Sequence, residues 1–345
     1  MSKRSQIERK LPRLADVADL AGVSSATVSR VLNHPSTVTP QVRRTVQSVI
    51  DALGYIPHGA ARALASRRSN TVGAVIPTID NAIFARCIQT FQERLFDSGF
   101  TLLLASSDYN FDREYREVQA LVGRGIDGLM LIGESHDPRV YKLLISKEVP
   151  YVNTWTYRQD SDHPCVGFDN EQAAHQIATY LLDIGHSRFA MVAGITNGND
   201  RALNRVSGVK RALRERATRI LPEHYNEWAY EIGEGRKATN YLLATPEPPT
   251  AIVCGNDILA LGALFECQAQ GIRVPRDISI TGFDGLNIAA QVEPPLTTMH
   301  IPSDEMGRKA AEYLLALLNG NPVADKTRLE ANLIVRKTTA PPAVS

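Results

Sequence analysis

Three aspartates lie at the ends of predicted strands, where side chains that do chemistry often gather. Asp169, Asp257 and Asp284 each end or closely follow a short apolar run. Carboxylates at such positions can act as general acids or bases, bind the hydroxyl groups of a ligand, or cap the following helix. The sequence contains no P-loop, no G-x-S-x-G and no H-E-x-x-H motif to supply partner groups for them. We therefore predict that the protein is not an enzyme.

One glycine pattern resembles a dinucleotide-binding motif. Gly123, Gly125 and Gly128 in "GRGIDG" match G-x-G-x-x-G. That motif requires a strand before the glycines and a helix after them, so that a phosphate meets the helix N-terminus. Here a predicted helix over 113–124 precedes the glycines and the strand "LMLI" follows them. The order is inverted, and we predict no cofactor.

The cysteines and histidines form no recognisable metal site. Cys87, Cys165, Cys254 and Cys267 are scattered without paired spacing, and the eight histidines are dispersed. We expect the cysteines to be buried free thiols of a reducing compartment. No apolar run approaches the length of a membrane span, and the first residues are charged. These features predict a cytoplasmic protein with no membrane partner.

The stretch "ADVADLAGVSSATVSRVLN", residues 15–33, has the spacing of two short amphipathic helices separated at Gly22. A third helix is predicted from Thr39 as N-cap and Pro40 as first helical residue, and Gly54 ends it. Two packed helices with small polar residues at the start of the second fit the major groove of DNA. A helix pair is also a common structural unit with no DNA role.

The charge distribution favours the DNA-binding interpretation. The whole chain has a net charge of +1, but residues 1–68 hold 11 Lys and Arg against 4 Asp and Glu. The remainder holds 27 Lys and Arg against 33 Asp and Glu. A basic segment joined to an acidic body indicates that only the basic segment meets phosphates.

From Thr71 onward, short apolar strands alternate with longer helical patterns. This alternation predicts βαβ units with parallel sheets and right-handed crossovers. The chain is 345 residues long and 43% hydrophobic, so the many units predict two doubly wound lobes and not one sheet. Ligands in such folds bind beyond the carboxyl ends of the strands, here in the cleft between the lobes. The expected strands are "TVGAVIP", "TLLLASS", "GLMLIG", "PYVNT", "FAMVAG", "TAIVCG" and "ISITGF". The expected helices span 84–98, 113–124, 171–184, 201–216, 233–244 and 257–270.

Several segments in order resemble the lactose-repressor/galactose-repressor (LacI/GalR) family of bacterial transcription factors. The resemblance runs from about Leu14 to "RKTTAPP" and rests on "LADVADLAGVSSATVSRVLN", "GYIP…AARALASRRSNTVGAVIP", "GHSRFAMVAG", "GNDILALGAL", "VPRDISITGFDGL" and "PPLTTMHIP". It implies an α + α/β architecture: a helix-turn-helix headpiece over 1–56 with a basic tail, a hinge helix over 57–69, and a two-lobed periplasmic-binding-protein-like core over 70–345. It also implies a homodimer, a near-palindromic operator and a small-molecule effector. The family's heptad tail has no counterpart after Arg336, which favours a dimer.

The resemblance assigns DNA-facing residues. In the family the second helix lies in the major groove, and the matching base-reading positions here are Ser24, Ser25, Ala26 and Arg30. Small Ser25 and Ala26 can approach a thymine methyl group, whereas Arg30 can reach guanine or a phosphate. The remaining expected contacts, to phosphates or within the headpiece, are Thr27, Ser29, Asn33 and Thr37. Arg13 stands where the family usually has an N-capping Thr, which puts that cap in doubt.

The linker around 57–69 matches the family's hinge helix. Leu64 matches a leucine inserted into the minor groove, where such a wedge unstacks one base step, and Arg62 is a further expected DNA contact. His58 and Gly59 depart from the usual Asn-Ala opening. Gly lowers helix propensity by about 1 kcal/mol relative to Ala, so we expect poor hinge order in the absence of the operator.

The resemblance also assigns the effector cleft. Aromatic faces there would stack on a ring, while Arg, Asn and Asp would bind hydroxyl groups. Trp155 stands where several sugar-binding members carry Asp, and Arg205 can bind hydroxyls or a carboxylate, so a sugar acid is also a candidate effector. The expected residues are Ile83, Phe84, Trp155, Arg205, Tyr230, Asn256 and Asp284.

These features predict a DNA-binding regulator, most simply a repressor, controlled by a sugar or sugar derivative. A purine-type effector is an alternative within the same architecture. A two-lobed solute-binding protein and a sugar-converting enzyme are alternatives from other classes. The basic helical segment disfavours the former, and the missing catalytic constellation disfavours the latter.

Overall fold

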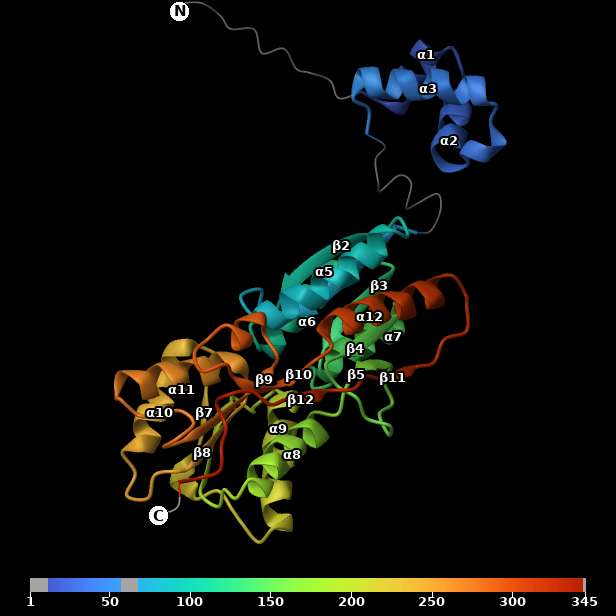
Figure 1. Ribbon diagram of the computed structural model, residues 1–345. Coiled ribbons are helices and arrows are strands. Elements are labelled where there is room, and N and C mark those ends of the chain that lie inside the picture. The colour runs from blue at the N-terminus through green and yellow to red at the C-terminus, as the bar shows by residue number, and fades with distance from the viewer. Residues whose placement is uncertain (1–11, 57–67, 344–345) are drawn as a thin grey trace, which may run out of the picture. The chain divides into compact units, whose positions relative to one another are not determined.

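The computed structural model describes residues 12–56 and 68–343 (Figure 1). The chain divides into two compact units, residues 1–69 and 70–345, and each is described by itself. The predicted hinge helix, with Arg62 and Leu64, lies for the most part outside the described residues.

The first unit contains the three predicted helices. They are α1 (Leu14–Ala21), α2 (Ser25–Asn33) and α3 (Pro40–Leu53), with a short 3₁₀ turn at Pro35–Thr37. Their apolar stripes meet in one small core built on Val17, Val28, Val31, Val46 and Ile50. Gly22 adopts a φ of +65° between α1 and α2, a conformation that glycine reaches without steric cost. Local sequence signals therefore set the ends of the three helices, and one shared core holds the helices together.

The helices α1 and α3 both begin without a hydrogen bond from a side-chain N-cap. Thr39 occupies the N-cap of α3, but its side chain accepts no capping bond, and Pro40 follows it. At α1 the N-cap is Arg13, and its backbone N–H donates to the Asp16 carboxylate at 2.7 Å. An acidic side chain in the first turn therefore replaces the missing Thr and complements the helix dipole.

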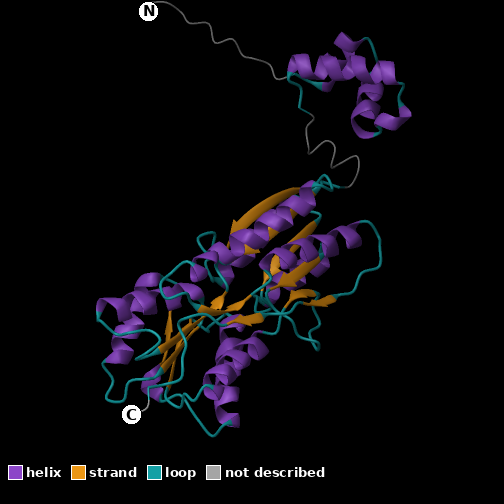
Figure 2. Ribbon diagram, viewed as in Figure 1, coloured by secondary structure: helices purple, strands orange, loops and turns teal. Residues whose placement is uncertain are grey.

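The second unit consists of two six-stranded sheets with helices on their faces (Figure 2). Lobe 1 has the strand order β11-β5-β4-β3-β1-β2 and is parallel throughout. Lobe 2 has the order β12-β10-β9-β8-β6-β7 and is parallel except for the antiparallel pair β10–β12. The strands of lobe 1 are β1 (Thr71–Ile76), β2 (Thr101–Ser106), β3 (Gly128–Ile132), β4 (Tyr151–Thr154), β5 (Cys165–Gly167) and β11 (Lys326–Arg328). Those of lobe 2 are β6 (Phe189–Gly194), β7 (Tyr225–Trp228), β8 (Ala251–Cys254), β9 (Ser279–Asp284), β10 (Thr297–His300) and β12 (Asn332–Ile334).

Side chains of one strand alternate between the two faces of its sheet, and both faces of lobe 1 are buried. Val72, Ala74 and Ile76 of β1 belong to the large core that α5 and α12 cover, whereas Val75 belongs to the core under α6 and α7. The helices of lobe 1 are α5 (Ala82–Phe96), α6 (Phe111–Gly123), α7 (Pro138–Ser146) and α12 (Ser303–Leu318). Those of lobe 2 are α8 (Asn170–Asp183), α9 (Asp200–Glu215), α10 (Ile232–Leu243) and α11 (Asp257–Ala269).

The chain crosses between the lobes three times. It leaves lobe 1 between β5 and α8, returns between β10 and α12, and leaves again between β11 and β12. The carboxyl ends of the parallel strands of both lobes face these crossings, so the loops after the strands gather between the lobes.

The predicted alternation of strands and helices is confirmed, with boundaries shifted by one or two residues. The helix expected over 84–98, for example, spans Ala82–Phe96. The strands β5 and β7 and the long helix α12 were not predicted from the sequence. β5 is three residues long and β7 is polar, "YNEW", so neither gives a clear apolar pattern. The glycine motif lies between the end of α6 and the start of β3, as its inverted order indicated.

We predict that Gly208→Ala destabilises the protein. The helices α8 and α9 pack closely, and a β-carbon at Gly208 would clash with the backbone carbonyl of Glu171. The loss should exceed the gain of about 1 kcal/mol that Ala brings to a helix interior. The matched control is Gly233→Ala near the start of α10, where no atom lies within 4 Å of the added carbon. Urea unfolding should show a lower midpoint for the first variant only; equal midpoints would contradict the close packing.

Candidate functional sites

Helix α2 presents a polar face opposite its buried one. Val28 and Val31 are buried in the headpiece core, whereas Ser25, Ala26 and Arg30 are exposed. Residues three, four and seven apart share one face of a helix, so Ala26 and Arg30 lie on one exposed stripe, with Ser25 beside it at the start of the helix. The stripe ends at exposed Asn33. The side chains of this stripe do not pack in the headpiece core, so they can contact another molecule.

Several of the predicted DNA contacts also make local bonds. The Ser24 side chain is the N-cap of α2 and accepts from the Thr27 backbone N–H at 3.2 Å. The Asn33 amide donates to the Ser29 hydroxyl at 3.2 Å, and the Thr37 hydroxyl donates to the His34 carbonyl at 2.7 Å. Ser24 is thus fixed by the start of the helix, and among the described members of the predicted set Ser25, Ala26 and Arg30 make no such local side-chain bond.

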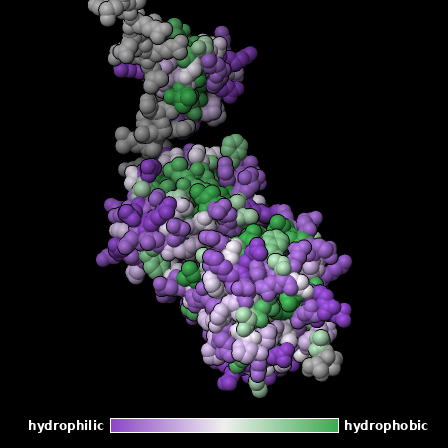
Figure 3. Space-filling view, turned by 90° about the vertical axis from the view of Figure 1, so that its left-hand side faces the viewer, coloured by the Kyte–Doolittle hydropathy of each residue, from purple (hydrophilic) through white to green (hydrophobic). Residues whose placement is uncertain are grey.

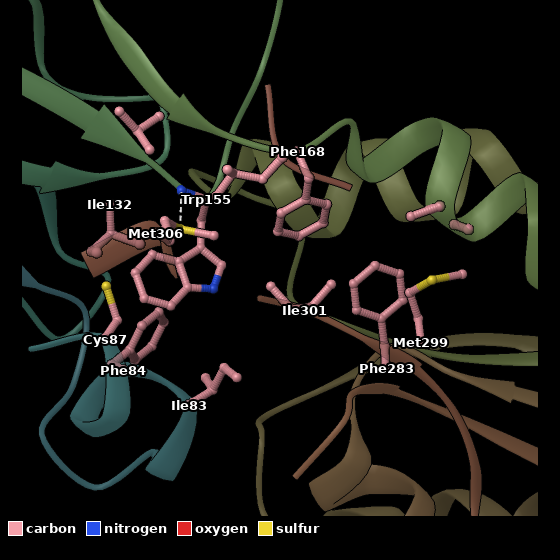
Figure 4. Packing of buried hydrophobic residues seen from close by; sticks show 14 of the residues in the cluster. Ile83, Phe84, Cys87, Ile132, Trp155, Phe168, Phe283, Met299, Ile301 and Met306 are labelled. Carbon is pink, nitrogen blue, oxygen red and sulfur yellow. Dashed lines mark hydrogen bonds between the residues drawn. The ribbon is translucent and has the colours of Figure 1, made fainter. Parts of the chain in front are cut away.

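A small enclosed cavity lies between the two lobes of the second unit. All seven residues predicted for the effector cleft line it. Ile83, Phe84 and Trp155 come from lobe 1, and Figure 4 shows them gathered together. Lobe 2 contributes the remaining four, Arg205, Tyr230, Asn256 and Asp284. The structure also places Asn81, Tyr109, Asn199 and Arg201 on the wall of the cavity.

Asn81, Tyr109 and Asn199 lie in the loops that follow strands β1, β2 and β6, and Arg201 lies in the first turn of α9. Sequence reasoning did not single them out, although the rule that ligands bind beyond the carboxyl ends of strands points to these loops. The "SDYN" and "TNGND" segments after β2 and β6 were the available signals. They are short polar stretches typical of ordinary turns.

Aromatic side chains form two sides of the cavity. Phe84 and Trp155 pack edge to face, with ring centroids 5.1 Å apart. Tyr109 of lobe 1 faces Tyr230 of lobe 2 at 6.3 Å. Trp155, Tyr109 and Asp284 have positive φ angles of 60°, 55° and 116°. Such conformations cost about 1–3 kcal/mol each and concentrate at ligand sites, where the surrounding structure maintains them.

Arg205 on α9 is buried and held from several directions. Its Nε donates to Asn170 at 2.9 Å and one terminal nitrogen donates to the Gly255 carbonyl at 2.8 Å. The same nitrogen lies 3.6 Å from the Asp284 carboxylate, and the guanidinium lies over the Phe283 ring at 3.7 Å. Arg205 is therefore both a wall of the cavity and a structural link inside lobe 2.

Polar bonds connect the lobes beside the cavity. Arg201 donates to the Ile132 carbonyl at 2.8 Å, and the Glu134 backbone N–H donates to Asp200 at 3.0 Å. The Asn170 amide donates to the Trp155 carbonyl at 2.8 Å. These bonds join the start of α9 and of α8 to the ends of β3 and β4. We refer to them as the interlobe bonds.

The cavity is small in this conformation. Its volume is about 20 Å³, room for about one water molecule. Asp200 and Asn170, which make two of the interlobe bonds, also line a second cavity of about 670 Å³ with mostly polar and charged walls. A ligand the size of a sugar therefore requires the lining side chains or the lobes themselves to move.

Burial perturbs two carboxyl groups at this site. It raises the pKa of Asp284 to about 6, an effect that nearby Arg205 and Arg201 oppose. Burial also raises the pKa of Asp257 to about 7, and the charge of Asp284 adds to the rise. Asp257 accepts from the Leu286 backbone N–H at 2.7 Å and from Thr298. Asp169, in contrast, is the N-cap of α8, and its side chain accepts from Gln172.

The part of the chain that the structure describes holds no cluster of metal-binding side chains. All four cysteines are buried and free, as predicted. Among the described residues, no helix has both the length and the apolar composition needed to cross a bilayer.

Comparison with known proteins identifies the family. Residues 13–58 match the model for bacterial regulatory proteins of the lacI family, and residues 178–339 match a periplasmic binding protein-like domain. The chain is 34% identical to catabolite control protein A of Priestia megaterium over 304 residues, 88% of this chain and 92% of that protein. This chain belongs to the LacI family.

Further relatives agree with this LacI-family assignment. The chain is 32% identical to the HTH-type transcriptional regulator GntR of Escherichia coli K12, with 93% of this chain and 96% of that protein covered. The lac repressor dimer bound to operator and an anti-inducer superposes with a TM-score of 0.86 at 26% identity, covering 96% of this chain and all of that one. The chain is thus a DNA-binding transcriptional regulator of the type controlled by small-molecule effectors, and the expectation that it is not an enzyme is confirmed.

We predict that Asp257→Asn changes how the stability of this LacI-family core depends on pH. A carboxyl group with a raised folded-state pKa keeps its proton where the unfolded chain has lost it, so stability falls as pH rises from about 4 to about 7. The amide has no such cost. Relative to wild type, the variant's melting temperature should therefore rise by several degrees between pH 5.0 and 7.5, since 1 kcal/mol is worth about 2–4 °C.

Asn can keep both contacts of Asp257, because its oxygen can accept from the Leu286 backbone N–H and its nitrogen can donate to the Thr298 hydroxyl, which donates to Asp257 in the wild type. The control is Asp97→Asn, which changes an exposed carboxylate at the end of α5. Parallel melting curves against pH for wild type and Asp257→Asn would show that Asp257 does not carry this dependence.

Proposed function

We propose that this regulator is a homodimeric repressor in which α2 contacts operator half-sites and the cavity between the lobes binds a sugar-type effector. The observation that carries the proposal is the convergence of all seven sequence-predicted residues on one interlobe cavity. The proposal includes the predicted boundaries of headpiece, hinge and core at 1–56, 57–69 and 70–345, and a cytoplasmic location.

The character of the cavity supports a monosaccharide or a derivative of one. Flat aromatic side chains can stack on the apolar face of a sugar ring, and charged and amide groups can bind its hydroxyls. Phe84, Trp155 and Tyr230 provide the first kind of group, and Asn256 and Asp284 provide the second.

The interlobe bonds can couple ligand binding in the cavity to the relative position of the two lobes. A ligand shifts a conformational equilibrium only by its difference in affinity for the two states. A sugar-sized ligand needs more room than this cavity offers, so its binding would move the lining side chains or the lobes, and with them the bonds of Arg201 and Asp200 to lobe 1. Effector binding would thereby change the relation of the lobes.

The headpiece supports operator contact. Its described part exposes Arg13, Arg30, Arg43 and Arg44, which can neutralise phosphates. Exposed Ser25 and Ala26 on α2 suit close approach to base edges. The proposed roles of Arg62 and Leu64 rest on the family resemblance.

An exposed apolar surface on lobe 1 supports the homodimer. β2 is an edge strand whose Leu104 is 40% exposed, and Phe96 at the end of α5 is 75% exposed. Apolar surface gathers in patches on the face of the molecule shown in Figure 3. An edge strand with exposed apolar side chains is usually covered by another structural element, and a second copy of this chain can cover β2.

Changing Ser25 and Ala26 should alter operator preference. Replacing both by Gln adds amides that can pair with adenine edges, so the sequences selected from a random DNA pool should change at two or three base positions. Effector binding, measured by thermal shift, should stay the same. The matched control is Leu20→Gln, which changes an exposed side chain on α1. An unchanged consensus would show that the start of α2 does not face bases.

The effector cavity is tested by thermal shift of the full chain against neutral sugars, sugar acids and purine nucleosides. A ligand at 100 times its Kd stabilises the folded state by about 2.7 kcal/mol, a shift of several degrees. Asp284→Asn should weaken binding at least 10-fold, because the carboxylate is the charged acceptor on the cavity wall. Asp97→Asn should not change binding.

Purine nucleosides stabilising the core, with no sugar effective, would favour the purine alternative. A sugar response that Asp284→Asn leaves unchanged would move the effector to another site. Ligand-dependent loss of binding to operator DNA in gel shifts then establishes the direction of control.

A further inference from the structure

Three long helices begin at the wall of the effector cavity. Asn81, Asn199 and Asn256 line the cavity and are the N-caps of α5, α9 and α11. The side-chain oxygen of each accepts from a backbone N–H of its own helix, at 3.2, 3.3 and 2.9 Å. Capping therefore directs each amide oxygen to its own helix, and of the three amide nitrogens that of Asn256 is buried without a partner among the described residues. Helix N-termini also carry partial positive charge.

Two buried donors at the cavity have no partner among the described residues. They are the Nδ2 of Asn256 and the Nε1 of Trp155, and each of these residues is 1% exposed. In Figure 4 the indole nitrogen of Trp155 points away from Cys87, toward the side where Ile301 and Phe283 lie. A buried donor left without an acceptor costs about 1–3 kcal/mol. Such a cost is expected where a ligand supplies the acceptor.

The two arginines add more donors than their protein partners use. Arg201 bonds through one terminal nitrogen to the Ile132 carbonyl and to Asp200. Arg205 uses its Nε and one terminal nitrogen. Within the described chain, the Nε and second terminal nitrogen of Arg201 and the second terminal nitrogen of Arg205 make no hydrogen bond. Both side chains line the cavity.

The acceptors at the cavity are few by comparison. The only carboxylate on its wall is that of Asp284, which already lies 3.6 Å from Arg205. The hydroxyls of Tyr109 and Tyr230 can donate or accept. A neutral sugar, whose hydroxyls each donate as well as accept, leaves this excess of donors unmatched. A carboxylate accepts only, and can take several donors including an arginine fork.

We propose that the effector carries a carboxylate, so that its chemical class is a sugar acid, with the carboxylate bound by Arg201, Arg205 and the Trp155 indole N–H. This inference rests on the proposed effector site and narrows its ligand. A single negative charge suits the cavity better than a phosphate dianion, because Asp284 faces the same space and Asp200 already pairs with Arg201 at 3.2 Å.

The test compares matched acids and neutral sugars on the full chain by isothermal titration calorimetry. The pairs are glucuronate with glucose, galacturonate with galactose, and gluconate with sorbitol; glucose 6-phosphate and adenosine complete the panel. In at least one pair the acid should bind 10-fold or more tightly than its neutral partner. Equal or tighter binding of the neutral partner in every pair overturns the proposal.

Two variants of one arginine examine the carboxylate contact. Arg201→Gln should reduce the affinity of the acid at least 10-fold and that of the neutral partner less than 3-fold. Arg201→Lys retains the charge and should retain most of the preference for the acid. The matched control is Arg214→Gln, which removes an exposed arginine from the same helix and should change neither affinity. Equal losses for acid and neutral sugar in Arg201→Gln contradict the assignment.

The remaining outcomes separate this proposal from the broader one. Neutral sugars that bind and lose affinity in Asp284→Asn overturn the carboxylate but leave the sugar site intact. Preferred binding of glucose 6-phosphate overturns the carboxylate in favour of a phosphate. Binding of adenosine alone, or of no compound in the panel, overturns both the sugar acid and the sugar-type effector.

Discussion

A buried guanidinium needs partners for its charge and its N–H groups, and the interior of lobe 2 supplies several of them to Arg205. Asn170 at the start of α8, the Gly255 carbonyl before α11 and the ring of Phe283 on β9 all contact this one side chain. The helix α9 that carries it is thereby fixed against three other elements. Because a buried charge without partners costs several kcal/mol, these elements have little freedom to separate.

The same constraint extends across the cleft. Asn170 accepts from Arg205 and donates to the Trp155 carbonyl, so one amide joins the arginine of lobe 2 to the tryptophan of lobe 1. One turn earlier on α9, Arg201 reaches the Ile132 carbonyl at the end of β3. Gly133 follows with a φ of +88°, and a β-carbon there would clash with the Arg201 guanidinium. Lobe separation and cavity size are therefore set by the same few polar groups, which is the arrangement a ligand-controlled switch requires.

The two units solve different physical problems. The headpiece buries four valines and one isoleucine with Ala18 and Tyr55, and leaves one helix face polar, so that face is available for contact with DNA. The core has a large buried interior in which polar groups are retained around a small cavity at the carboxyl ends of the strands. Retaining unpartnered donors such as the Trp155 indole N–H costs stability, and a ligand that supplies acceptors recovers it.

The sequence by itself determined the headpiece and the general architecture of the core. The helical spacing of Val28 and Val31 in the second helix and of Val46 and Ile50 in the third, with Gly22 and Gly54 as stops, is a local signal that needs no long-range contact. The alternation of strands and helices likewise required two parallel α/β lobes, and the family resemblance named seven residues that do converge on one cavity.

Only the tertiary structure decided how that cavity is closed and what its chemistry is. The strands β5 and β7 were not predicted. β5 has only three residues and β7 is a polar edge strand, so neither shows a clear alternation of apolar residues. Tyr109 and Asn199 in loops, and Arg201 in the first turn of α9, were not predicted because their roles depend on residues of the other lobe that they meet. Whether an asparagine offers its oxygen or its nitrogen to a ligand depends on which atom caps a helix, and whether an arginine is satisfied depends on carbonyls far away in sequence. These are properties of distances between distant segments, and a linear pattern of residue types does not contain them.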